Sequence, residues 1–399
     1  MSLNPGEMAK QPLKVALVHP KYRPDGGSER LLDDIIDILL QNRVEVLLVT
    51  REWGKNTENV KVVKCSSFYM GRLWRDWGFY WAAQKKLAKL DVDIIHSQVH
   101  LPNCNVYYAG GGVHGEWLAQ KNKISNPFKK LATRTSLFHN LKKYLEKHTY
   151  LNQRLDAVIC NSEMVKKDIT KHFDVPAHKL HTIYPGINFK NFNTENRSEH
   201  REKTRGALNI PDHHTVFIFV GSGFERKGVA ILIDAFAELP VDCELLIIGK
   251  DKNLNRYKKK TVRLNISERV HFLGMQKEVK HFYLASDVFV LPSLYDAFAL
   301  VIVEAMACGL PVIASNKCGA AYDFIENGQT GFFFDPFDKN RLVEYMLKLR
   351  APKLRDQISA NAMNVISNCD LNTMSQNFMK LYEKLLENKL RHKNPRFSD

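Results

Sequence analysis

Thr215-Val-Phe-Ile-Phe-Val220 leads directly into Gly221-Ser-Gly-Phe-Glu-Arg-Lys-Gly228, and this stretch decides the fold. Its first half is a short, continuous apolar run rich in β-branched and aromatic residues, which predicts a buried strand. Its second half opens with glycines and ends with two cations where a helix is expected to begin. A strand, a glycine-containing loop and a helix in this order form the repeating unit of a doubly wound α/β domain, which binds ligands beyond the carboxyl ends of its strands.

Similar apolar runs recur along the chain in two series, with helical stretches between them. The first series comprises residues 14–18, 44–50, 93–96, 105–108 and 157–160, and the second comprises residues 215–220, 244–248, 270–273, 288–291 and 311–314. Continuous apolar strands that alternate with helices predict parallel sheets covered on both faces. One intervening helix is expected over residues 28–41, where the apolar residues form a single stripe at helical spacing.

The two series predict two domains. A polar stretch, residues 188–204, lies between them, and we interpret it as a linker. The chain of 399 residues also exceeds what one hydrophobic core usually serves. We therefore expect two doubly wound, Rossmann-like α/β domains, residues 1–187 and 188–370, facing across a cleft between the carboxyl ends of their sheets. A C-terminal helix at about 371–390 is expected to return to the first domain.

The composition limits the class of protein. Hydrophobic residues at 44% and charged residues at 25% are ordinary for a soluble globular chain. There is no apolar run of roughly 18 residues, which predicts no membrane-spanning helix. The short polar N-terminus lacks the apolar core of a signal peptide, so a cytoplasmic protein is expected.

The seven cysteines are scattered along the chain, and no two of them form a C-x-x-C pair. This pattern indicates neither a disulfide framework nor a zinc site, so we interpret the cysteines as small apolar core residues. No D-x-D motif is evident either, and no metal site is predicted.

The formal net charge of +15 and the isoelectric point near 9.3 indicate anionic partners. Nucleotide phosphates, an acidic lipid surface and nucleic acid each satisfy this condition. A basic nucleic-acid-binding protein is therefore one hypothesis. The sequence contains no recognised nucleic-acid-binding module, so nucleic acid is not expected as a partner.

Two glycine-containing loops are candidate phosphate sites. Pro24-Asp-Gly-Gly27 follows the first predicted strand, and the paired Gly26 and Gly27 let a backbone approach a phosphate at a helix N-terminus. A plain tight turn is the alternative, because the loop is not a G-x-G-x-x-G fingerprint. In the second domain, Arg226 and Lys227 lie where a helix begins and oppose its dipole. A diphosphate bound between them explains that arrangement, and two solvated surface cations are the alternative.

Asp296-Ala-Phe-Ala-Leu-Val-Ile-Val-Glu304 places two carboxylates around an apolar run that begins a buried helix. A buried carboxylate is costly unless it accepts hydrogen bonds, and the vicinal hydroxyls of a ribose would satisfy Glu304. Free N–H groups at Phe298, Ala299 and Leu300 are expected to receive a sugar or phosphate. The alternative is a helix-capping Asp296 and a core Glu304 with protein partners.

Together these motifs resemble glycosyltransferase family four, whose members are retaining enzymes with the two-domain GT-B fold. Asn161-Ser-Glu163 and Tyr184-Pro-Gly-Ile187 are also in place for that family, and the resemblance extends over roughly residues 14–390. Within the family the chain is most similar to the lipopolysaccharide core glucosyltransferases, through residues 221–228 and Val106-Tyr-Tyr-Ala109. The resemblance implies that the first domain binds the acceptor and the second binds a nucleotide-sugar donor.

The resemblance also implies a donor site. Its residues would be Gly26, Gly27, Arg226, Lys227, Met275, Asp296, Phe298, Ala299, Leu300 and Glu304. Arg226 and Lys227 would clamp the diphosphate, and Glu304 would hold the ribose. Asp296 would face the sugar hydroxyls, and Met275 would lie beside the base.

The implied catalytic residues are His114, Asp296, Arg226 and Lys227. His114 lies in Gly110-Gly-Gly-Val-His-Gly-Glu116, where many family members have a histidine near the reacting centre; a structural histidine is the alternative. His19, in the loop after the first strand, is a further candidate. The family usually has Glu where this chain has Asp296, so the donor sugar or its pose is expected to differ.

The resemblance thus implies a hexosyltransferase that moves a hexose, glucose from UDP-glucose, onto a lipopolysaccharide core or another lipid-linked glycan. It also implies retention through same-face attack, and no pair of carboxylates in the sequence is placed as nucleophile and acid. Arg226 and Lys227 would stabilise the leaving diphosphate without a metal ion or a cofactor. A nucleotide-sugar epimerase or a sugar phosphorylase of the same fold is the alternative.

Residues 121–154 contain seven Lys and two Arg against a single acidic residue, Glu146. Phe128, Leu131, Phe138, Leu141 and Leu145 recur near helical spacing, which predicts a basic amphipathic helix. Such a helix is expected to dock on an anionic membrane or a lipid-linked glycan, at the inner face of the cytoplasmic membrane. The alternative is a solvated helix that packs its apolar stripe on the core.

Overall fold

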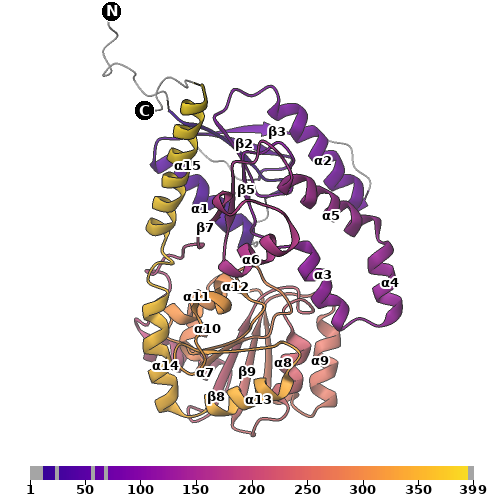
Figure 1. Ribbon diagram of the computed structural model, residues 1–399. Coiled ribbons are helices and arrows are strands. Elements are labelled where there is room, and N and C mark those ends of the chain that lie inside the picture. The colour runs from indigo at the N-terminus through magenta and orange to yellow at the C-terminus, as the bar shows by residue number, and fades with distance from the viewer. Residues whose placement is uncertain (1–11, 23–26, 55–58, 67–70, 394–399) are drawn as a thin grey trace, which may run out of the picture.

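The computed structural model describes residues 12–22, 27–54, 59–66 and 71–393, and it contains two β-sheets stacked one above the other with helices around each (Figure 1). The first sheet has seven strands in the order β3-β2-β1-β4-β5-β6-β7, and the second has six in the order β10-β9-β8-β11-β12-β13. Neighbouring strands run parallel throughout. The chain therefore forms two doubly wound α/β domains, as predicted from the alternation of strands and helices.

The strands have the following bounds: β1 Lys14–Val18, β2 Glu45–Thr50, β3 Val60–Lys64, β4 Ile94–Ser97, β5 Val106–Tyr108, β6 Ala157–Cys160, β7 Leu180–Thr182, β8 Thr215–Val220, β9 Cys243–Ile248, β10 Val270–Gly274, β11 Val288–Leu291, β12 Val312–Ser315 and β13 Phe332–Phe334. The helices are α1 Gly27–Gln41, α2 Gly71–Leu87, α3 His114–Lys123, α4 Pro127–Thr135, α5 Leu137–Tyr150, α6 Glu163–His172, α7 Arg197–Ala207, α8 Val229–Phe236, α9 Leu254–Arg263, α10 Lys280–Ala285, α11 Leu300–Ala307, α12 Gly319–Phe324, α13 Lys339–Lys348, α14 Pro352–Val365 and α15 Leu371–Lys393.

Both faces of the first sheet are buried, which explains why its central strands are continuously apolar. In β1, Val15 and Leu17 belong to the apolar cluster under α1, whereas Ala16 and Val18 belong to a different cluster under α2. Successive side chains of a strand point to opposite faces, so both sets must be apolar. The second sheet is enclosed in one large cluster of the same kind.

Three strands, β3, β7 and β13, were not predicted, and all three lie at the edges of the sheets. β7 and β13 contain only three residues each, and β3 is interrupted by the exposed Lys61. An edge strand has a neighbour on one side only, so a long apolar run is not required of it. Every one of the seven cysteines is buried and unpaired, which confirms their interpretation as core residues.

The polar stretch read as a linker is in its second half a packed helix, α7, so that prediction was wrong from Arg197 onward. Arg205 of α7 is only 1% exposed. Its guanidinium donates to the carbonyl of Ala285 over 2.9 Å and to the carboxylate of Asp287 over 2.7 Å. The polar residues of this stretch therefore attach α7 to the second domain.

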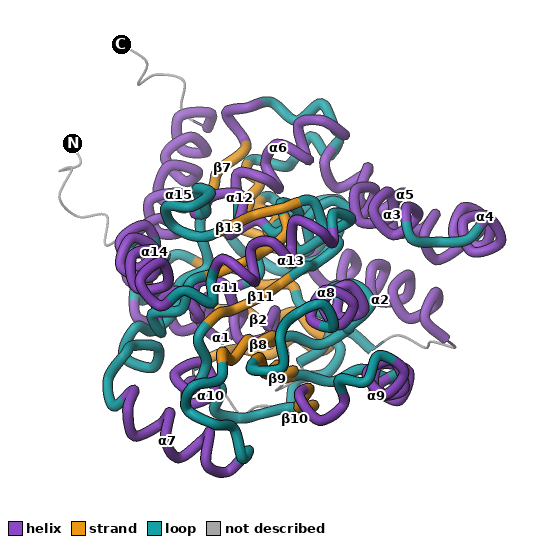
Figure 2. The backbone as a smooth tube through the Cα atoms, turned by 90° about the horizontal axis from the view of Figure 1, so that it is seen from below, coloured by secondary structure: helices purple, strands orange, loops and turns teal. Residues whose placement is uncertain are grey.

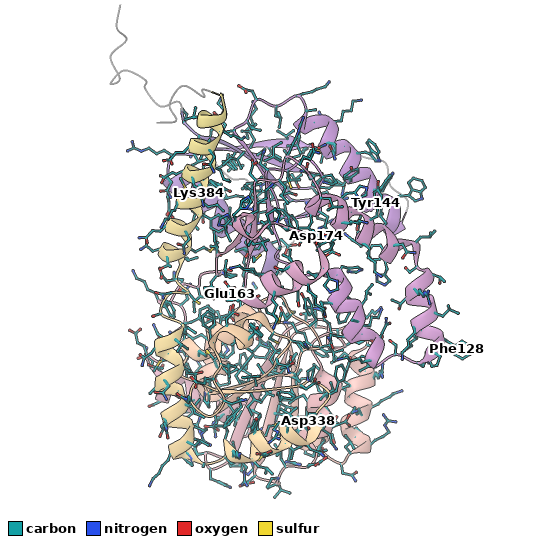
Figure 3. All side chains as sticks on the ribbon, in the orientation of Figure 1. Phe128, Tyr144, Glu163, Asp174, Asp338 and Lys384 are labelled. Atoms are coloured by element: carbon teal, nitrogen blue, oxygen red, sulfur yellow. The ribbon has the colours of Figure 1, made fainter. Side chains whose placement is uncertain are left out.

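The chain returns to the first domain through its last helix. α14 lies beside the second domain and α15 beside the first (Figure 1). Met374, Phe378 and Tyr382 of α15 join the apolar cluster that α1 covers, while Lys384 points outward (Figure 3). The Tyr382 hydroxyl lies 2.6 Å from Nδ1 of the fully buried His96, whose pKa burial lowers to about 3. The neutral imidazole can therefore accept this hydrogen bond.

The basic segment forms three helices, α3, α4 and α5, instead of the single helix predicted over residues 121–154. Asn126 caps α4 by accepting from the Lys129 amide, and Pro127 occupies the first helical position, which ends the preceding helix. Its predicted apolar stripe is divided as well, because Phe128 is 84% exposed and Leu145 is 3% exposed. The three helices project to one side of the molecule, opposite α14 and α15 (Figure 2).

Phe378→Ala should lower the free energy of unfolding by about 3–5 kcal/mol, because it leaves a cavity between α15 and the first domain. Urea denaturation followed by circular dichroism would measure this loss. Lys384→Ala, on the exposed face of the same helix, is the matched control and should change stability little. Equal stability of the two variants would show that α15 does not contribute to the core.

Candidate functional site

The strand order places one reversal point in each domain. In the first sheet the order reverses between β1 and β4, and in the second between β8 and β11. Ligands of doubly wound folds bind beyond the carboxyl ends of the strands at such points. The loop after β8 carries Arg226 and Lys227, and the loop after β11 carries Asp296. Three of the predicted residues, Arg226, Lys227 and Asp296, therefore lie at the reversal point of the second sheet.

The loop after β8 is held by packing at both ends. The Phe224 ring is fully buried, and its amide donates to the Asp251 carboxylate over 2.8 Å. Gly228 has φ 75°, and a Cβ there would lie 1.9 Å from the carbonyl oxygen of Pro292. Only glycine allows this approach, which brings the two cations before it to the loop after β11.

Both cations contact the carboxylate of Asp296. Lys227 Nζ is hydrogen-bonded to Asp296 Oδ2, and Arg226 Nη1 lies 3.4 Å from the same oxygen. Arg226 also donates to the carbonyl of Tyr295 over 3.1 Å. Lys227 and Asp296 are buried, whereas 42% of the Arg226 side chain is exposed. The interpretation of the two residues as solvated surface cations therefore does not hold for Lys227.

The charge state of Asp296 follows from these contacts. Burial acts to raise the pKa of its carboxyl, but the attraction of Lys227 and Arg226 outweighs burial and lowers the pKa below the ordinary value. The amide of Phe298 donates to the same carboxylate and adds to this effect. Asp296 is thus a buried anion that balances part of the charge of two cations.

Glu304 lies behind this group, on α11. It is 6% exposed, and one of its oxygens accepts a hydrogen bond of 3.0 Å from the Tyr283 hydroxyl. Burial raises the pKa of Glu304, while Tyr283, Arg30 and Lys227 act in the opposite direction. The prediction of a core glutamate with a protein partner is therefore correct for one oxygen, and the ribose role stays a prediction.

Two residues near Glu304 were not singled out from the sequence. Tyr283 lies on α10, inside an apolar stretch that offers no polar pattern. Arg30 lies in the first turn of α1, a helix of the other domain, yet its charge acts on Glu304. A cation in the first turn of a helix opposes the dipole. Arg30 thus has the same sequence feature as Arg226 and Lys227, a cation near the beginning of a helix.

The backbone before α11 partly corrects the prediction of three free amides. The Phe298 amide donates to Asp296, so only the amides of Ala299 and Leu300 remain candidates for a ligand. Ala299 has φ 67°, a left-handed conformation that is strained for any residue with a Cβ. With this conformation at Ala299, the chain turns into α11 directly after the loop that contains Asp296.

Tyr295, which precedes Asp296, links the two domains. Its hydroxyl accepts from the Val113 amide over 3.0 Å and donates to the Asp168 carboxylate over 3.0 Å. A Cβ at Gly112 would lie 2.3 Å from the Tyr295 hydroxyl oxygen, so glycine is needed there. The sequence contained no signal for this contact, because the partners are far apart along the chain.

His114 follows Val113 and begins α3. Its Nε2 lies 3.1 Å from Nδ1 of His139, and its backbone amide donates to Glu146 over 2.9 Å. Burial, together with His139 and nearby lysines, lowers the pKa of His114 to about 4, so the ring is neutral at neutral pH. Among the described residues, the hydrogen-bonding contacts of His114 are with Glu146 and His139 and do not include Asp296. The neighbouring Val113 contacts Tyr295, which precedes Asp296.

Glu146, the single acidic residue of the basic segment, is 2% exposed. Its Oε1 accepts from the His114 amide and lies 3.9 Å from Nε2 of His100. Burial raises the pKa of Glu146 to about 7, although the His114 amide, Lys143 and Lys142 act to lower it. Glu146 therefore caps the first turn of α3 from inside the basic segment.

The remaining candidates occupy separate places. Gly26 lies outside the described residues, whereas Gly27 is the first residue of α1. His19 is 7% exposed, and its ring nitrogens lie 2.9 Å from Gln98 Oε1 and 3.1 Å from the Lys21 carbonyl. Met275, at the carboxyl end of β10, is 45% exposed and accepts a hydrogen bond from Ser222. Its contact with a base stays a prediction.

Comparison with known proteins gives a match in each domain. Residues 25–191 match Glycosyltransferase Family 4, and residues 200–365 match Glycosyl transferases group 1. Lipopolysaccharide glucosyltransferase WaaG of Escherichia coli (strain K12) is 25% identical over 371 residues, which cover 91% of this chain and 96% of WaaG. D-inositol 3-phosphate glycosyltransferase of Corynebacterium diphtheriae is 31% identical over 194 residues, 46% of this chain and 45% of that protein.

Solved structures show the same fold. The crystal structure of WaaG, a glycosyltransferase involved in lipopolysaccharide biosynthesis, aligns with a TM-score of 0.79 at 23% identity and covers 93% of this chain and 99% of that one. Anabaena Alr3699/HepE in complex with UDP-glucose aligns with a TM-score of 0.71 at 20% identity and covers 93% of this chain and 100% of that one.

Two doubly wound domains, each with a glycosyltransferase match, define a GT-B glycosyltransferase. The chain belongs to glycosyltransferase family four and is a hexosyltransferase related to WaaG.

Glu146→Gln tests the buried carboxyl. Because the folded pKa of about 7 exceeds the ordinary 4.5, the contribution of Glu146 to stability is largest below pH 4.5 and declines as the pH rises to about 7. Gln lacks this dependence and can still accept from the His114 amide. Between pH 5 and pH 8 the variant should therefore gain roughly 2–3 kcal/mol of unfolding free energy relative to wild type.

Urea denaturation at both pH values would measure this difference. Glu387→Gln, on the exposed face of α15, is the control for loss of one carboxylate. If the difference in unfolding free energy between Glu146→Gln and wild type stayed constant across this pH range, the pKa of Glu146 would not be raised by folding.

Proposed function

We propose that this hexosyltransferase moves glucose from UDP-glucose, with retention, onto a lipopolysaccharide core or another lipid-linked glycan. The observation that carries this proposal is the joint contact of Arg226 and Lys227 with Asp296, beside the buried Glu304. WaaG is a lipopolysaccharide glucosyltransferase, and HepE is known in complex with UDP-glucose. Both relatives support this choice of donor, and WaaG supports the choice of acceptor.

The donor diphosphate is proposed to replace Asp296 as the partner of the two cations. A diphosphate carries more negative charge than one carboxylate, and guanidinium groups bind phosphate oxygens in bidentate fashion. Arg226 can turn toward the ligand because 42% of its side chain is exposed. Asp296, released from the cations, can then accept hydrogen bonds from the sugar hydroxyls.

Glu304 is proposed to hold the ribose. One of its oxygens already accepts from Tyr283, and its burial is costly unless the other oxygen is also satisfied. A ribose hydroxyl would supply that hydrogen bond. The positive charges of Lys227 and Arg30 favour the ionised form that accepts it.

Transfer is proposed to proceed by same-face attack. The bond between the anomeric carbon and the diphosphate oxygen breaks, and its electron pair stays on the diphosphate. The acceptor hydroxyl forms the new bond on the same face and passes its proton to the departing diphosphate. Arg226 and Lys227 stabilise the charge that accumulates there. No metal dependence is expected, because these cations supply the electrostatic stabilisation.

A thermal-shift screen against nucleotide sugars tests the donor, since a ligand of the native state raises the melting temperature. UDP-glucose is expected to give the largest shift, and incubation with acceptor should release free UDP. Release of a C4-epimerised nucleotide sugar without free UDP would instead indicate an epimerase.

Arg226→Ala combined with Lys227→Ala should reduce the transfer rate by about 100-fold or more, because each cation acts like an oxyanion-stabilising donor. Lys258→Ala combined with Lys259→Ala, on the exposed face of α9, is the control with the same change of charge. Turnover of free UDP from UDP-glucose and acceptor would measure the loss. A near-normal rate in the first double variant would show that Arg226 and Lys227 do not stabilise the diphosphate during transfer.

We further propose that the protein associates peripherally with an anionic membrane at its cytoplasmic face. In the described residues no helix is both long and apolar enough to span a bilayer. Phe128 and Leu137 are 84% and 72% exposed, at α4 and the start of α5, and Phe128 points away from the body of the molecule (Figure 3). Trp74 and Trp81 of the neighbouring α2 are each 58% exposed. Exposed aromatic residues among lysines favour a membrane interface.

Phe128→Ala combined with Leu137→Ala should therefore weaken co-sedimentation with vesicles that contain anionic lipid, about 10-fold for the apolar area lost. Val241→Ala combined with Val262→Ala, two exposed residues of the second domain, is the control. Binding of the wild type should fall with added salt. Absence of any vesicle binding by the wild type would contradict membrane association.

A further inference from the structure

A cavity with a volume of about 460 Å³ lies in the first domain, between α3, α4 and α5. It is lined by Leu118 and Asn122 of α3, by Lys130, Leu131, Thr133 and Arg134 of α4, and by Lys143 of α5. The wall thus combines three cations, two leucines and two small polar side chains, and none of the described residues that line it is acidic.

The three cations of this cavity are unpaired among the described residues. Lys130, Arg134 and Lys143 form no ion pair there, whereas the adjacent Lys142 lies 3.0 Å from Asp76. Cations that converge on one cavity from two helices repel each other unless an anion lies between them. A phosphate group is the anion that Arg and Lys bind together most strongly.

Asn122 supplies an independent polar group in the same wall. Its side-chain oxygen is buried and has no hydrogen-bond partner within the described part of the chain. A buried polar atom without a partner costs free energy, which a ligand hydroxyl would recover. Leu118 and Leu131 add apolar surface of the kind on which the C–H face of a sugar ring packs. The wall therefore fits a sugar that carries a phosphate.

The cavity is also close to His114, one of the catalytic residues that the family resemblance implies. Leu118 lies one turn along α3 from His114, and Asn122 lies two turns away, about 12 Å along the helix axis. Lys143, which lines the cavity, is near enough to lower the pKa of His114 through its charge. One glycan chain could therefore place one sugar in the cavity and another sugar beside His114.

We propose that this cavity binds a phosphate-bearing sugar of the acceptor glycan and so fixes the acceptor hydroxyl relative to His114. The site presupposes the proposed transferase function, and it names the acceptor class as a phosphorylated glycan. A membrane phospholipid is the less suitable occupant, because the two most exposed apolar side chains of α4 and α5, Phe128 and Leu137, do not line the cavity. Leu131, which does line it, is less exposed than either, at 61%.

The test compares a deacylated lipopolysaccharide core oligosaccharide with the same oligosaccharide after chemical removal of its phosphates, in solution without lipid. Arg134→Gln combined with Lys143→Gln should raise the KM for the phosphorylated acceptor about 10-fold to 100-fold. The KM for UDP-glucose should not change. Lys129→Gln combined with Lys147→Gln, one exposed lysine on each of the same helices, is the matched control.

For the wild type, the dephosphorylated acceptor should show a KM as high as that of the Arg134/Lys143 variant, and that variant should no longer distinguish the two acceptors. Equal KM values for both acceptors with wild type would overturn the phosphate site while leaving the transferase intact. Loss of binding to phosphatidylglycerol vesicles by the variant, with its KM unchanged, would assign the cavity to a lipid headgroup and contradict the acceptor site. Failure of wild type to transfer to either form, despite hydrolysis of UDP-glucose, would overturn the proposed acceptor and this site with it.

Discussion

The ion pairs that Asp296 forms with Lys227 and Arg226 are the interactions on which the rest of the site depends. A buried carboxylate is stable only when opposite charges and hydrogen-bond donors surround it. Meeting that need brings the loop after β8 against the loop after β11, and Gly228 allows the close approach. The reversal point of the second sheet therefore holds two cations and one carboxylate in a fixed arrangement.

The same loop joins the two domains, because Tyr295 contacts both Val113 and Asp168 of the first domain. His114 follows Val113, so the hydrogen bond between the Val113 amide and the Tyr295 hydroxyl fixes the position of His114 relative to the loop after β11. Glu146 fixes the other side of His114 by accepting from its amide. The two domains are thus connected by direct hydrogen bonds through Tyr295, which hold the segment that contains His114 close to the loop that contains Asp296.

The fold could be predicted from the sequence where strands are buried on both faces, because such strands must be continuously apolar. Edge strands such as β3 lack that requirement and were missed. In the site, the motifs identified Arg226, Lys227 and Asp296, since charged residues at strand and helix ends are conspicuous. Tyr283 and Glu146 were not foreseen, because their roles come from tertiary contacts with residues distant along the chain or on another helix. The pattern of apolar and polar residues in a segment indicates which of its side chains are buried. It does not indicate which distant residues those side chains contact.

Asp296 is proposed to be the counter-ion of Arg226 and Lys227 in the absence of donor and to be displaced when the donor diphosphate binds. Isothermal titration of UDP into wild type and Asp296→Asn, each checked for native circular dichroism, tests this proposal most directly. Removing the competing carboxylate should leave UDP affinity unchanged or increase it, while the rate of sugar transfer falls. A loss of UDP affinity of about 10-fold or more in Asp296→Asn, with the fold intact, would contradict the account.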